Sequence, residues 1–181
     1  YRLPAGHRLR VAVSSSYWPM LWPQPEAAEL TLVGGTLELP ERRAQAVEDE
    51  VTFEPAQSAA PLQDKAIRPA SHVRRTEIDH QTGQVSLIIE DDFGLSENAD
   101  HGLIWGGVAR ERWTIHPDDP LSARGVTHWT EEIRRGDIAL RTETHGEMWS
   151  DATTFYLRAR LEAWEGDALV YERDFEDQIP R

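Results

Sequence analysis

The sequence predicts an all-β protein, mainly an antiparallel sheet in a β-sandwich or partly open barrel, with at most one or two short helices. Apolar and polar residues alternate with a period of two over long stretches, as in strands that bury one face and wet the other. Pairs containing glycine, suited to tight hairpin turns, separate these stretches. No long segment shows the 3.6-residue apolar period of a helix.

The N-terminal part predicts one strand, a loop and a hairpin. Residues 8–13 alternate leucine and valine with arginine and alanine, which indicates a half-buried strand. Prolines at positions 19, 23 and 25 cannot donate backbone hydrogen bonds and predict a loop. Residues 28–40 place leucines on both sides of Gly34-Gly35, which predicts two short strands and a tight turn.

The middle of the chain, residues 44–70, is rich in alanine, glutamine, glutamate and proline and predicts a linker or wrapping segment. It contains one short predicted strand at residues 51–55. The best candidate for a helix is residues 40–50, but its apolar stripe is thin.

From residue 71 onward, longer strands are predicted in succession. The predicted turns lie at Thr82-Gly83, Asp118-Asp119, Arg135-Gly136-Asp137 and Glu165-Gly166-Asp167. In residues 154–165, apolar side chains should occupy one face and charged side chains the other. We therefore expect three parts: residues 1–43 as terminal strands of a jelly-roll-like domain, residues 44–70 as the connection, and residues 71–181 as an antiparallel β extension.

Charge and composition exclude several classes of protein. The chain has 32 acidic and 19 basic residues and a formal charge of −13, so it should repel nucleic acid and anionic membranes. No window approaches the roughly 18 apolar residues of a membrane span. Without cysteine there is no disulfide, thiolate nucleophile or cysteine zinc site. The chain begins at Tyr1, so we expect the natural N-terminus to lie upstream; a cytoplasmic location is favoured.

Serine and histidine motifs give no catalytic assignment. A nucleophile elbow needs small residues two positions either side of the serine, but Ser16 has Trp18 two positions after it, and the prolines that follow rule out the helix of such an elbow. His101 beside Asp100, and His116 beside Asp118, leave a metal-assisted hydrolase as a minor alternative. A turn-forming aspartate next to a surface histidine is the favoured interpretation. We therefore predict no catalytic residue, no metal site and no cofactor.

Seven tryptophans are many for a chain of this length. Trp113 and Trp129 lie inside alternating strands, which favours packing in a core or at an interface. The alternative is a row of exposed rings that stack on sugars, as in a free-standing carbohydrate- or ligand-binding module. The candidates for interface or ligand contact are Tyr17, Trp18, Met20, Trp22 and Trp105.

Residues 3–19, LPAGHRLRVAVSSSYWP, combine Pro-x-Gly-His, an alternating strand, three serines, an aromatic residue and proline. This pattern resembles the C-terminal β-domain of serine hydrolases of the cocaine esterase type, the CocE/NonD family, whose relatives include the X-Pro dipeptidyl-peptidases. Residues 28–43 look like the strand pair that ends that domain, and the remaining tail looks like an extension carried by larger members. The resemblance implies a jelly roll that packs against a catalytic α/β-hydrolase domain and a helical cap, and that supplies no nucleophile.

The leading hypothesis is a non-catalytic accessory β-domain that supports the catalytic domain and its cleft by packing. The resemblance implies that the parent enzyme hydrolyses an ester or amide through an acyl-enzyme, with a triad that is not in this sequence. The chain alone should be inactive. Its expected partner is the parent α/β-hydrolase domain, and a homo-oligomer is possible. A jelly roll needs about eight strands, so its early strands should lie upstream of Tyr1.

Overall fold

The computed structural model describes residues 3–26, 28–41 and 52–181, and its described part is all-β without a helix, which confirms the predicted fold class. Eight strands form one sheet. They are β1 (Asp64–Arg68), β2 (Ser71–Ile78), β3 (Val85–Asn98), β4 (Ile104–His116), β5 (Asp119–Arg135), β6 (Ile138–Ser150), β7 (Thr154–Glu165) and β8 (Ala168–Pro180).

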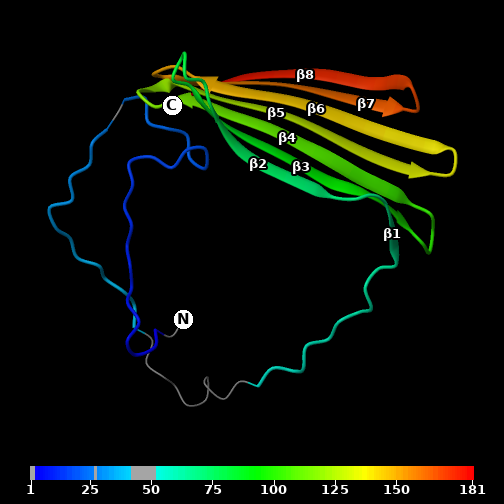
Figure 1. Ribbon diagram of the computed structural model, residues 1–181, viewed down its shortest axis with the longest axis horizontal. Coiled ribbons are helices and arrows are strands. Elements are labelled where there is room, and N and C mark those ends of the chain that lie inside the picture. The colour runs from blue at the N-terminus through cyan, green and yellow to red at the C-terminus, as the bar shows by residue number, and fades with distance from the viewer. Residues whose placement is uncertain (1–2, 27, 42–51) are drawn as a thin grey trace.

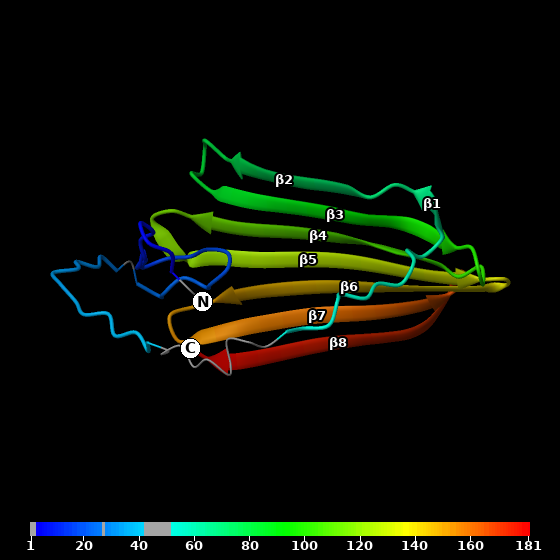
Figure 2. The same ribbon diagram turned by 90° about the horizontal axis from the view of Figure 1, so that it is seen from below.

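The sheet is open, and its eight strands lie in one layer (Figures 1 and 2). From β3 to β8 each strand pairs antiparallel with the next one in the chain. At the other edge, β1 and β2 both pair with β3, at different positions along it. Because neighbours in sequence are neighbours in space, the fold is a meander that local hairpins determine.

The predicted hairpin turns of the sheet are confirmed. Gly136 and Gly166 lie in the turns β5–β6 and β7–β8 with φ of +57° at each, a conformation that glycine adopts without a steric penalty. The turn between β2 and β3 contains Gly83, also with positive φ. Asp119 accepts a hydrogen bond from the Leu121 backbone N–H at 3.0 Å, in keeping with a turn-forming role.

Strand register sorts the side chains into two contrasting faces. One row runs across the sheet through paired residues of β2 to β8: Val73, Glu90, Arg110, His128, His145, Arg160 and Asp174. We call the face that carries this row the charged face. The adjacent residues project from the opposite, apolar face, which includes Trp113, Met148, Leu157 and Phe175. For β7 this division is the one predicted from the sequence.

The apolar face lacks a second layer. Among the described residues, only Ile88, Leu95, Ala109 and Ala123 are buried hydrophobic residues. The accessible surface is 14918 Å², against roughly 8,900 Å² expected for a compact monomer of 20.6 kDa. Both the single-layer sheet and the exposed residues described before it contribute to this excess.

Of the described residues before β1, those at 17–23 lie at one end of the sheet, and those at 52–63 lead into β1 at the other end (Figure 1). The strands predicted at residues 8–13, 28–40 and 51–55 are not strands in the described residues. A strand needs a partner for its backbone groups, and here Val11, Val13 and Leu32 remain 63%, 66% and 78% exposed. The helix considered at residues 40–50 falls almost wholly on residues 42–51, outside the described residues.

β1 begins at Asp64, inside the segment predicted as a connection. The division into three parts, with a jelly-roll end over residues 1–43, stays a prediction. No helix in the described ranges is long and apolar enough to cross a membrane.

Candidate docking face

The centre of the apolar face is a trough of about 460 Å³. Its floor consists of small residues on adjacent strands, since Thr127, Gly146 and Ala159 are directly paired across β5, β6 and β7. Larger apolar side chains border it, namely Trp113, Met148, Leu157 and Phe175. The trough therefore arises from the order of small and large residues across the sheet rather than from a loop.

Trp113 lies directly over Gly125, its partner in β5. A Cβ atom on Gly125 would be 2.5 Å from the Cζ3 atom of the Trp113 ring, so only glycine leaves room for this position of the ring. The indole Nε1 of Trp113 donates a hydrogen bond to Glu111 Oε2 at 2.8 Å. The ring is thus fixed in orientation at one end of the trough.

An aromatic loop, residues 17–23, packs on this end of the sheet. Trp18 meets Trp113 edge to face, with ring centroids 5.9 Å apart. Trp22 meets Trp18 at 5.0 Å and Phe155 of β7 at 6.1 Å, also edge to face. These are the arrangements that aromatic pairs prefer, and each adds to the apolar burial of the rings.

Polar contacts hold the same loop to the C-terminus of the chain. The Trp22 Nε1 donates to Ser150 Oγ at 3.0 Å, and Arg181 Nη1 donates to the same oxygen at 2.9 Å. Arg181 also donates to the Pro23 carbonyl oxygen, and its guanidinium lies over the Phe155 ring. Ser150 is 5% exposed, so its hydroxyl joins the loop and the C-terminus in a nearly dry place.

The turn after Ser150 is stabilised by a carboxylate. Asp151 accepts hydrogen bonds from the backbone N–H groups of Thr153 and Thr154 and from the Tyr156 hydroxyl. These bonds to the charged form, the Thr153 amide foremost, lower the pKa of Asp151 to about 2. The Asp151 hydrogen bond also raises the pKa of Tyr156.

The structure brings together only some of the predicted contact residues. Trp18 and Trp22 are half-buried against the sheet, whereas Tyr17 and Met20 of the same loop are 64% and 73% exposed. Trp105 lies elsewhere on the face and lines a smaller hollow of about 200 Å³ together with Phe93 and Trp129. The roles of these five candidates stay predictions.

Sequence reasoning did not include Phe155, Ser150 and Arg181 among the contact residues. The alternation in residues 154–165 placed Phe155 on the apolar face of its strand, and this placement predicts that Phe155 packs against other apolar groups. No local sequence pattern indicates that Trp22 lies near Ser150 and Arg181, because these contacts depend on how the loop folds back onto the sheet.

The remaining motifs make local contacts. The Ser14 hydroxyl donates to the Ser16 carbonyl oxygen at 2.6 Å, a turn of the kind that serines form within one loop. His101 Nδ1 accepts a hydrogen bond from the Leu103 N–H, and His116 Nδ1 accepts one from the Asp118 N–H. Each imidazole therefore stabilises a local turn through its Nδ1 atom.

Within the described ranges, one group of side chains could hold a metal ion, and the sequence interpretation missed it. His128, Glu143 and His145 lie on the charged face, with one ligand atom from each within 4.8 Å of the others. His128 and Glu143 are 15 residues apart in sequence, so they form no short-range ligand motif. The predicted turn at Gly136 was enough to place the two histidines together. Arg135 pairs with Ile138 beside the turn, and counting seven residues away from the turn along each strand pairs His128 with His145.

Comparison with known proteins finds one similarity, over the first third of the chain. The family of the X-Pro dipeptidyl-peptidase C-terminal non-catalytic domain matches residues 1–63. No curated protein and no solved structure matches the chain. The match ends one residue before β1, so the sheet lies beyond it. Through residues 1–63 the chain is thus similar to the C-terminal non-catalytic domain of X-Pro dipeptidyl-peptidases, which confirms the resemblance carried by residues 3–19.

Proposed function

We propose that the chain is a non-catalytic accessory region of an X-Pro dipeptidyl-peptidase-like serine hydrolase, and that its apolar face docks on the rest of that enzyme. The observation that carries this proposal is a single-layer sheet whose apolar face is uncovered and whose N-terminal extension matches that family. The sheet then supports the catalytic domain by packing and borders its cleft.

The energetics of the face support this role. Isolated soluble proteins rarely leave a large contiguous apolar patch in water. Leu157, Phe175 and Ile179 are 36%, 41% and 45% exposed, and all three project from the same face. Fully burying such a side chain contributes about 1.5–3 kcal/mol, so covering what remains exposed yields roughly 1 kcal/mol for each residue. Many such side chains together can hold two domains.

The charged face is suited to water. Its charged side chains pair with each other across the strands, as do Arg158 with Glu176 and Arg75 with Glu90, at 3.1 Å each. Exposed pairs of this kind contribute little to stability but remain hydrated at low cost. The contrast between the two faces indicates one docked side and one solvent side.

The alternative, a sugar-binding module, receives less support from the ring geometry. Sugars stack on rings that are exposed and nearly coplanar. On the apolar face, Phe93 and Trp129 are tilted by 47°, and the rings of the aromatic loop meet edge to face; a near-parallel pair, Trp149 and Tyr156, lies on the charged face. Rings in these arrangements pack on each other and on an apolar partner rather than forming a platform.

The proposal is tested by mixing the 181-residue chain with the separately expressed catalytic part of the hydrolase and measuring complex formation by size-exclusion chromatography. The Leu157→Glu variant places a charge on the apolar face and should weaken the complex at least tenfold. The matched control, Arg158→Glu, changes the neighbouring residue on the opposite face and should bind like the wild type. Equal binding by both variants, or no complex at all, would overturn the proposal.

Catalysis provides a second check of the same assignment. The chain alone should give no hydrolysis of a p-nitrophenyl ester above the buffer blank. Saturable hydrolysis by the purified chain would contradict a non-catalytic role.

A further inference from the structure

We propose that His128, Glu143 and His145 form a binding site for a divalent transition-metal ion of the zinc class on the charged face of the sheet. The site is separate from the docking face, because its side chains project from the other side of β5 and β6.

The backbone brings the two histidines as close as a sheet allows. They face each other in an antiparallel pair without a register shift. In a two-residue hairpin the closing pair is hydrogen-bonded and the pairs alternate from there, so the seventh pair outward is of the non-hydrogen-bonded kind. Side chains of such pairs approach most closely, with Cα atoms about 4.5 Å apart. Glu143 lies two residues before His145 and thus on the same face.

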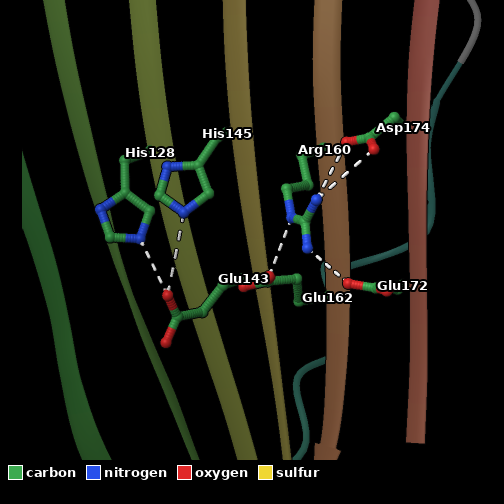
Figure 3. A network of polar contacts seen from close by, with 7 residues as sticks. All are labelled: His128, Glu143, His145, Arg160, Glu162, Glu172 and Asp174. Carbon is green, nitrogen blue, oxygen red and sulfur yellow. Dashed lines mark hydrogen bonds and ion pairs between the residues drawn. The ribbon is translucent and has the colours of Figure 1, made fainter. Parts of the chain in front are cut away.

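The Nε2 atoms of both histidines lie near the same carboxylate oxygen (Figure 3). His128 Nε2 lies 3.3 Å from Glu143 Oε2, and His145 Nε2 lies 3.9 Å from the same oxygen. Tetrahedral zinc with bonds of about 2.0–2.2 Å holds its ligand atoms roughly 3.3–3.5 Å apart. The first separation meets that requirement, and the second exceeds it by about 0.5 Å.

The imidazole rings must rotate before both can bind one ion. They are stacked with centroids 4.1 Å apart and planes 13° from parallel, so their lone pairs run side by side. Binding requires turning the rings about both the Cα–Cβ and the Cβ–Cγ bonds, so that both lone pairs point to a position next to Glu143 Oε2. The Cβ–Cγ torsion is soft, because it joins a tetrahedral to a planar carbon.

The ligand set selects the class of ion. Two imidazoles and one carboxylate are a common ligand set for zinc, and three protein ligands leave one position open to water. The side chains of His128 and His145 are 33% and 49% exposed, so an ion can enter directly from solvent.

The surrounding charges favour a cation. Arg141 donates to the other oxygen of Glu143, Oε1, which orients the carboxylate and leaves Oε2 for the histidines. Arg160, opposite His145, contacts three carboxylates, those of Glu162, Glu172 and Asp174 (Figure 3). The three negative charges more than neutralise the positive charge of Arg160.

On the other side of the site, Arg110 faces His128 from β4 and Glu90 faces Arg110 from β3. Arg110 adds a positive charge next to the site, besides that of Arg141, and should weaken the binding of a cation. We expect moderate affinity as a result.

The test is a zinc titration of the full 181-residue chain, free of any affinity tag and treated with chelator, by calorimetry at pH 7.5. One zinc ion should bind per chain, and cobalt should bind in its place with a visible absorption band from the coordinated ion. His128→Gln and His145→Gln should each weaken zinc binding at least tenfold. The control is His72→Gln, since His72 pairs with Asp91 at 3.0 Å on the same sheet without a second histidine; it should bind zinc within twofold of the wild type.

A measurement on the unaltered protein covers the case in which a variant does not fold. Zinc should slow the modification of His128 and His145 by diethyl pyrocarbonate, detected by mass spectrometry, and leave that of His72 unchanged. The absence of saturable 1:1 binding would overturn the proposal. Unchanged affinity in both histidine variants, or equal protection of all three histidines, would also overturn it.

Discussion

Replacing Gly125 by alanine should destabilise the sheet through one identifiable clash. The added Cβ would lie 2.5 Å from Trp113 Cζ3 and 2.8 Å from Cε3, whereas ordinary contacts begin near 3.4 Å. The ring must therefore lift by about 1 Å, because Gly125 is held in a strand between two paired neighbours. Trp18 rests on that ring, so the aromatic loop should loosen as well.

The expected change in the free energy of unfolding is the sum of two destabilising contributions and one stabilising contribution. Overpacking of this kind costs about 1–3 kcal/mol. Weakening the contact between Trp18 and Trp113 adds up to about 0.5–1.5 kcal/mol. Alanine in place of glycine stabilises the fold by about 0.5–1 kcal/mol, because the unfolded alanine variant has less conformational freedom to lose on folding. We therefore expect a loss of about 2 kcal/mol in the free energy of unfolding.

Urea unfolding followed by circular dichroism measures this loss. Gly34→Ala is the matched control, since a Cβ at Gly34 would meet nothing within 4 Å, and it should change the stability by less than about 0.5 kcal/mol. In a Trp113→Val background the cost of Gly125→Ala should disappear. A Gly125→Ala protein as stable as the wild type, or an equal cost in both backgrounds, would refute the proposed clash.

Two further predictions concern the loop and the turn beside it. Trp22→Phe keeps an aromatic ring next to Phe155 but removes the donor to Ser150, which should loosen the loop by about 1 kcal/mol and speed its cleavage by protease; an unchanged cleavage rate would contradict the hydrogen bond. The pKa of Asp151 is lowered, so its contribution to stability should be complete above about pH 4 and disappear as the pH falls through about 2. An NMR titration of its carboxyl group should give a midpoint near 2, and a midpoint near 3.8 would rule out the turn contacts.

The sheet was predictable because its determinants are local. Turn glycines such as Gly136 and Gly166 and the period of two in the flanking residues define hairpins without reference to the rest of the chain. The same alternation at residues 8–13 and 28–40 was misleading when taken alone, because pairing depends on partner strands that the described residues do not provide.

The docking face was only partly predictable. The tryptophan count and the alternating strands indicated a packing surface, but the contact of Trp18 with Trp113 joins segments that are distant in sequence and required the folded loop. The His128–His145 pair is a different case. Register counted from the turn at Gly136 would have placed it, although its two histidines belong to no short-range ligand motif.

The docking of the apolar face is tested most directly by thiol labelling, for which the absence of cysteine from the chain provides a clean background. Leu157→Cys reports on the apolar face and Arg158→Cys on the charged face. In the isolated chain both thiols should react rapidly with a maleimide. When the chain is joined to the rest of the hydrolase, labelling at position 157 should slow at least tenfold while position 158 stays unchanged, as mass spectrometry of the labelled peptides will show. Equal labelling at position 157 in both states would contradict the account.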